Sequence, residues 1–302
     1  MVHYLFILLA VACFAAQFAF TKLYENRVGQ ALSGTLVMLV GINLVGTGIF
    51  LLAGGFRVAV SPVSVFWAVI FAVIMIPYFL LGIKVLSLGS LAIYSMFMML
   101  GGMLVPFFYG VLVLHEEISV AKIIGTALLA FFIVLQAVSQ NGSRDSSGSR
   151  KTKYLFFALC ILIFFVNGMT GVVTKAHSVS DGAVDEVSFT VISCGLTALF
   201  SGIGLLITLI RSRRETATAI KSALKGKALL IMVLLGAAAY GGNFLMLLAA
   251  NNVPASVQFP LVSGGVIVLS ALVSVGIFKE KISRLEMCSI IGAFAATFLF
   301  AI

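Results

Sequence analysis

The side chains best suited to bind a ligand in this chain are uncharged polar groups that lie inside long apolar runs. They carry hydroxyls or amides, and those well inside the runs are Gln17, Asn43, Tyr78, Tyr94, Ser95, Asn167, Tyr240, Asn243 and Gln258. A polar group in hydrocarbon has no water to bind, so it must find a protein partner or line a hydrated cavity. A hydrogen bond between helices, worth only about 0.6 kcal/mol on average, is the favoured explanation for any single residue.

Two pairs of these residues point instead to a cavity. Tyr78 and Asn243 occupy corresponding places in the two halves of the chain, and so do Tyr94 and Gln258. Neutral hydrogen-bonding groups repeated near mid-membrane are suited to a shared solute site. The predicted substrate-binding residues are Gln17, Tyr78, Tyr94, Asn167, Tyr240, Asn243 and Gln258.

The apolar runs that hold these residues are long enough to be membrane-spanning helices. Hydrophobic residues make up 62% of the 302 positions, charged residues 10%, and the mean hydropathy is +1.20. A soluble domain would have about a quarter charged residues, and one span needs about 20 apolar residues. We therefore predict an all-α polytopic membrane protein with ten spans, at residues 3–21, 33–53, 64–85, 90–114, 119–139, 153–174, 186–210, 227–250, 254–278 and 284–302.

The ten predicted spans divide into two related sets of five. Gly101-Gly102 recurs as Gly264-Gly265, 163 positions later, and Ile118-Ser119 recurs as Ile282-Ser283, 164 positions later. This pattern indicates an internal duplication. The first repeat covers residues 1–139, a Gly/Ser-rich polar linker covers 140–152, and the second repeat covers 153–302. Because five is odd, the second copy must be inverted in the membrane, as in many secondary transporters.

The repeated motif resembles a known family. Each half has a glycine pair, an apolar run and an ending that reads Glu116-Glu117-Ile118-Ser119 or Glu280-Lys281-Ile282-Ser283. Together these features resemble the paired EamA-type repeats of the drug/metabolite transporter superfamily. The resemblance implies ten helices, a central cavity between the halves, and export or exchange of small metabolites by alternating access.

Positive charges predict how the chain crosses the membrane. Sixteen Lys and Arg residues lie in the loops on the side of the linker, whereas only Arg57, Lys122 and Lys175 lie on the other side. The positive-inside rule then places the linker in the cytoplasm and both termini outside. The family resemblance implies termini in the cytoplasm; we follow the charges. Lys22 and Lys175, at the ends of spans one and six, are expected to reach toward the interface.

Small residues and proline mark places where helices pack closely or bend. The predicted packing or hinge positions are Gly101, Gly102, Pro106, Gly264 and Gly265. Glycines let helix backbones approach one another, or supply a flexing point for alternating access. Proline inside a span kinks or breaks it.

Several other classes of function are not expected. His3, His115 and His177 are scattered at helix ends, so neither a metal nor another cofactor is expected, and no titratable pair within the membrane supports an enzyme. The net charge of +9 is explained by loop orientation, so no nucleic-acid partner is expected. No Asp or Glu lies inside a predicted span, which disfavours a proton-coupled antiporter with a carboxylate in its first helix. Glu117 and Glu280 are expected to shape the turns between helices.

The sequence thus predicts a secondary transporter in the cell (inner) membrane. It would move a small neutral, zwitterionic or weakly charged organic metabolite, amino acid-like or drug-like, because no Lys or Arg at mid-span could balance a strong anion. The expected partners are that substrate and the lipid bilayer, and the oligomeric state is left open. The alternative is a non-transporting membrane component or a channel-like pore.

Overall fold

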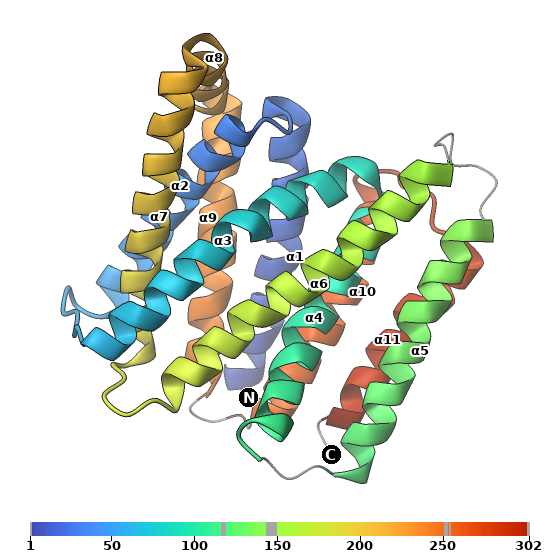
Figure 1. Cartoon of the computed structure of the whole chain (residues 1–302). Coiled ribbons are helices and arrows are strands. Elements are labelled where there is room, and N and C mark those ends of the chain that lie inside the picture. The colour runs from blue at the N-terminus through green and yellow to red at the C-terminus, as the bar shows by residue number, and fades with distance from the viewer. Residues whose placement is uncertain (1, 116–118, 143–149, 251–252, 254, 301–302) are drawn as a thin grey trace.

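The computed structural model describes residues 2–115, 119–142, 150–250, 253 and 255–300. These residues form a bundle of α-helices followed by a short 3-10 turn (Figure 1). The helices are α1 (Val2–Val28), α2 (Leu32–Ala53), α3 (Pro62–Leu88), α4 (Leu91–Leu112), α5 (Val120–Gly142), α6 (Arg150–Ser178), α7 (Glu186–Arg211), α8 (Arg213–Ala223), α9 (Gly226–Ala250), α10 (Ala255–Gly276) and α11 (Arg284–Thr297), with the turn at Phe298–Phe300.

Eight of these helices are long and apolar enough to cross a membrane, which confirms a helical, multi-pass membrane architecture. They are α1, α2, α3, α4, α6, α7, α9 and α10. The other two predicted spans correspond to α5, which has an apolar stretch at Val120–Leu135, and to α11, which has 14 residues.

Two connections differ from the prediction. The segment between spans seven and eight is not a loop throughout, because it contains α8, whose Thr216, Ala219 and Ala223 are buried. The predicted linker is also shorter, since α5 ends at Gly142 and α6 begins at Arg150. Residues 143–149 lie outside the described residues, as do Glu116, Glu117 and Ile118 of the repeated motif.

Polar side chains begin several helices. The Ser61 hydroxyl accepts a hydrogen bond from the Ser64 N–H before Pro62, and Ser283 and Glu286 form a capping box on α11. Asp185 caps α7 and accepts the Ser188 N–H at 2.9 Å. Partial burial raises the pKa of Asp185, but hydrogen bonds from Ser188 and neighbouring amides outweigh it, so the pKa lies below its ordinary value.

The helices of the two halves pack in a reciprocal pattern. When each half is numbered from its first long helix, α1 corresponds to α6, α2 to α7, α3 to α9, α4 to α10 and α5 to α11. α1 packs on α9, and its counterpart α6 packs on α3. α4 packs on α6 as α10 packs on α1, and α3 packs on α7 as α9 packs on α2. The corresponding helices α2 and α7, α4 and α10, and α5 and α11 pack directly on each other.

Two details of the backbone also relate the halves. Gly204 on α7 approaches Leu36 near the start of α2, whereas Gly54 after α2 approaches Val187 at the start of α7, so these corresponding helices are antiparallel. His115 and Lys279, 164 positions apart, both have φ of 54°. Non-glycine residues rarely adopt this conformation, so its presence after both α4 and α10 indicates the same turn in each half.

Glycines bring α4 and α6 into backbone contact. A Cβ on Gly101 would collide with the Phe164 backbone, and one on Gly168 would collide with Val105. Gly102 approaches Asn167, while Pro106 fills the space beside Gly171. In the other half, a Cβ on Gly264 would approach Thr297 and Phe294, and one on Gly265 would approach Val11.

Adding one methyl group at the α4–α6 contact should destabilise the protein. Gly101→Ala forces a backbone shift, and overpacking of this kind typically costs about 1–3 kcal/mol. Gly48→Ala on α2 is the matched control, because a Cβ there meets nothing within 4 Å, and alanine favours helix. Thermal unfolding in detergent should show a lower Tm for Gly101→Ala only. Equal Tm values for the two variants would contradict the tight contact.

Candidate functional site

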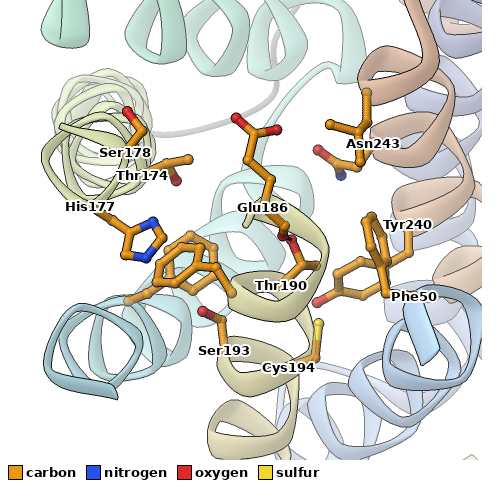
Figure 2. Close-up of a pocket in the computed structure, with 13 residues that line it drawn as sticks. Phe50, Thr174, His177, Ser178, Glu186, Thr190, Ser193, Cys194, Tyr240 and Asn243 are labelled. Carbon is orange, nitrogen blue, oxygen red and sulfur yellow. Dashed lines mark hydrogen bonds between the residues drawn. The ribbon is translucent and has the colours of Figure 1, made fainter. Parts of the chain in front are cut away.

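A pocket of about 180 Å³ opens between the two halves, at the end of the bundle opposite the linker. It is walled by the end of α2, the first half of α3, the end of α6, the start of α7, and α9 (Figure 2). This volume is below the roughly 300–1,000 Å³ of drug-sized ligand sites, so the pocket suits a small organic solute.

The walls of the pocket combine aromatic rings with neutral hydrogen-bonding groups. The rings belong to Phe50, Phe71 and Phe189, and the polar groups belong to Thr174, His177, Ser178, Thr190, Ser193, Tyr240 and Asn243. The single carboxylate among the lining residues is that of Glu186. In Figure 2 it extends into the space between α6, with Thr174, and α9, with Asn243.

Ser193 supplies an unused hydrogen-bonding group to this pocket. Its side chain is only 2% exposed, and its Oγ has no hydrogen-bond partner among the described residues. A buried hydroxyl without a partner costs free energy, so such groups are rare and call for an explanation.

The Tyr240 side chain on α9 contacts helices of both halves at the inner end of the pocket. Its hydroxyl donates to Asn43 Oδ1 on α2 at 2.6 Å and is a hydrogen-bond partner of Cys194 on α7. Gly46 leaves room for its ring, and Phe50 contacts the ring edge-on with centroids 6.4 Å apart. The Tyr240 side chain is therefore held in place before any solute arrives.

His177 forms the opposite wall. Its Nε2 is 2.9 Å from Ser64 Oγ on α3, and its ring stacks on Phe189 with centroids 3.8 Å apart. Ser64 Oγ also accepts the Val184 N–H at 3.0 Å. These contacts join α3 of the first half to α6 and α7 of the second.

Three predicted residues lie deeper than the pocket, in a row of neighbouring polar side chains that we call the polar series. Gln17 lies next to Tyr78, and Tyr78 lies near both Tyr94 and Tyr240. The exposed fractions of Tyr78 and Tyr94 are 8% and 3%. The structure therefore places four of the seven predicted residues in a series that leads inward from the pocket, with Asn243 lining the pocket itself.

The remaining two predicted residues join neighbouring helices. Asn167 on α6 donates to Met98 O on α4 at 2.5 Å. Gln258 on α10 donates to Met246 O on α9 at 2.6 Å. Neither is among the residues that line the pocket.

The opposite, linker-side end of the polar series is occupied by an ion pair. Lys22 on α1 pairs with Glu280, which follows α10, and their side chains are only 13% and 15% exposed. The other Glu280 oxygen accepts the Leu91 N–H and the Ser90 hydroxyl at the start of α4, each at 3.0 Å. Ser274 on α10 donates to the same oxygen. We call these five residues the linker-side cluster.

The backbone after α10 aims Glu280 at this cluster. The positive φ of Lys279 turns the chain back, and the Glu280 N–H then bonds to Ser274 O at 3.1 Å. Lys22 is further positioned by the Phe278 ring, whose centroid is 5.2 Å from its Nζ. The structure thus shows both a turn, as expected for Glu280, and a charge contact between the halves.

One sequence expectation is corrected here. Lys22 does not reach toward the interface, because α1 continues to Val28 and Lys22 pairs inward with Glu280. The sequence reasoning also missed His177, Glu186 and Ser193 as lining residues. His177 and Glu186 lie near helix ends, and Ser193 resembles an ordinary packing residue. For Glu186, the available sequence signal was its position in an acidic connection between two spans.

No protein-family model and no curated protein matches this chain.

Breaking the Lys22–Glu280 pair should cost more than removing both charges. Lys22→Met leaves the mostly buried Glu280 carboxylate without its ion-pair partner, which we expect to cost up to about 3 kcal/mol, reduced by residual solvent contact. Glu280→Gln leaves the ammonium unpaired in the same way. The double variant should be more stable than the sum of the single changes predicts. Thermal unfolding of the four proteins measures this coupling; additive losses would mean that the charges do not interact.

Proposed function

We propose that this protein is a carrier of small organic solutes across the cell (inner) membrane. The observation that best supports this is the pocket itself, which is open at one end of the bundle and is lined by aromatic rings and neutral hydrogen-bonding groups. Beyond the pocket, the polar series leads toward the linker-side cluster, which closes the other end. A solute site open to one side and closed to the other is the arrangement that alternating access requires.

Several features support two inverted five-helix repeats. The helix contacts are reciprocal between halves, α2 and α7 are antiparallel, and the same left-handed turn follows α4 and α10. The second EamA-like motif, which begins at Glu280, directly follows the Lys279 turn, whereas Glu116, Glu117 and Ile118 of the first motif lie outside the described residues. In such a carrier, the two ends would exchange open and closed states by motion of one half against the other.

The pocket's chemistry favours a particular class of solute. Its hydroxyls and amides suit a neutral or zwitterionic metabolite, and its aromatic rings suit an apolar portion. Glu186 and the neighbouring Asp185, whose pKa is lowered, place negative charge at the mouth. We therefore propose an amine-bearing solute, amino acid-like or drug-like, with its ammonium near Glu186.

A disulfide across the linker-side cluster should separate binding from transport. The Ser90 and Ser274 hydroxyl oxygens are 3.4 Å apart, so cysteines in both places need little movement to bond. In a background without Cys13, Cys160, Cys194 and Cys288, oxidised Ser90→Cys/Ser274→Cys should bind solute from the pocket side but lose flux in liposomes. Reduction should restore flux.

The same experiment tests the alternative of a channel-like pore or a non-transporting component. A carrier gives saturable flux that solute on the opposite side stimulates, and reduced Ser90→Cys/Ser274→Cys supplies the matched control. Linear flux, or flux unchanged by oxidation, would contradict alternating access through this end. The ligand is first identified by thermal stabilisation across a metabolite library, because a bound solute raises Tm by mass action.

Glu186→Gln should change selectivity rather than folding. Losing one charged hydrogen bond should weaken binding of amine-bearing solutes by about tenfold, while neutral solutes bind as before. Asp181→Asn, an exposed acid that does not line the pocket, is the control. Thermal-shift titrations report both affinities. Equal weakening of amines and neutral solutes would reject the ammonium contact but leave the carrier intact.

A further inference from the structure

A basic depression lies on the linker side of the bundle, away from the pocket and the linker-side cluster. Its volume is about 360 Å³, and it is lined by Arg27 at the end of α1, by Ser222, Lys225, Gly226 and Lys227 around the α8–α9 turn, and by Ala228. Arg27, Lys225 and Lys227 are all exposed. Three cations thus converge on one small space.

The lining of this depression has no acidic side chain. Glu25, the acid nearest to Arg27 in the chain, is buried and accepts a hydrogen bond from Gln30. The start of α9 at Gly226 adds the positive end of a helix dipole. The depression is therefore built for an anion, and its three cations suit a phosphate group.

The surroundings of the depression indicate a lipid as the source of that phosphate. α8 is short and joins the ends of two membrane-spanning helices, α7 and α9, so it lies at the membrane surface. Leu224, Leu229 and Leu230 are 51%, 38% and 57% exposed beside the three cations. Apolar side chains next to a cation cluster match a molecule that has both acyl chains and a charged headgroup.

We propose that this depression binds the phosphate headgroup of an anionic phospholipid, with its acyl chains along Leu224, Leu229 and Leu230. Basic pockets between membrane helices on the cytoplasmic side bind such headgroups, and the positive charges of this chain favour that side. The lipid would join the end of α1 to the α8–α9 turn.

The test is lipid-induced thermal stabilisation of the full chain in a neutral detergent. Phosphatidylglycerol should raise the Tm by on the order of 5 °C when in large excess over its dissociation constant. Phosphatidylcholine and inorganic phosphate at matched concentrations should not. Lys225→Gln/Lys227→Gln should weaken the phosphatidylglycerol effect by roughly 30-fold in concentration, given the attraction contributed by each lysine.

The control removes the same charge elsewhere on the same side. Lys84→Gln/Lys281→Gln changes two exposed lysines outside the depression and should respond to phosphatidylglycerol as the unchanged protein does. Equal weakening in both double variants would indicate general charge attraction and overturn the site. Stabilisation by inorganic phosphate alone would show a free-anion site and reject the lipid. Each outcome is independent of whether the protein transports a solute.

Discussion

The ion pair between Lys22 and Glu280 is the contact on which the arrangement of the two halves depends at the linker side. Taking each charge out of water costs several kcal/mol, whereas their attraction at contact is on the order of 4 kcal/mol at an effective dielectric constant of 20. The attraction between the two charges would therefore barely offset the cost of taking them out of water. Hydrogen bonds to Glu280 from Ser90, Leu91 and Ser274 supply the rest. These partners come from both halves. Opening this end would therefore require either that the contacts break or that the residues move as one unit.

The helices could largely be predicted from the sequence, because twenty consecutive apolar residues have few alternatives to a membrane span. The chain between Arg211 and Lys227 was harder, since the buried face of α8 consists of Thr216, Ala219 and Ala223. These small side chains give a weak apolar pattern, so the polar residues around them dominate and suggest a loop. Lys22 and Glu280 are 258 positions apart, and single-sequence patterns do not show which charged groups meet across such a distance.

The candidate site was only partly predictable for a different reason. Polarity shows that a membrane side chain needs a partner but not which partner it finds. Asn167 and Tyr240 were equivalent in this respect, yet one bonds a neighbouring backbone carbonyl and the other lines the pocket. Helical residues point in directions about 100° apart, so small differences in rotation decide between these outcomes. His177 and Glu186 were missed because their helix-end positions suggested the interface rather than a binding wall.

The contacts that join the two halves differ in chemistry at the two ends of the proposed carrier, although the helices around them pack in a reciprocal pattern. At the pocket end, neutral hydrogen bonds join the halves: Trp67 Nε1 to Ser180 and the Ala59 N–H to Ser188, each at 3.0 Å. At the linker side, the Lys22–Glu280 ion pair and two charge-assisted hydrogen bonds, from Ser90 and Leu91 to Glu280, do so. Hydrogen bonds to charged groups contribute about 1.5–3 kcal/mol each, against about 1 kcal/mol for neutral ones. The similar helix packing therefore does not imply equal energies for the two access states of such a carrier. A solute that stabilises the state of higher energy must make up the difference through its own contacts.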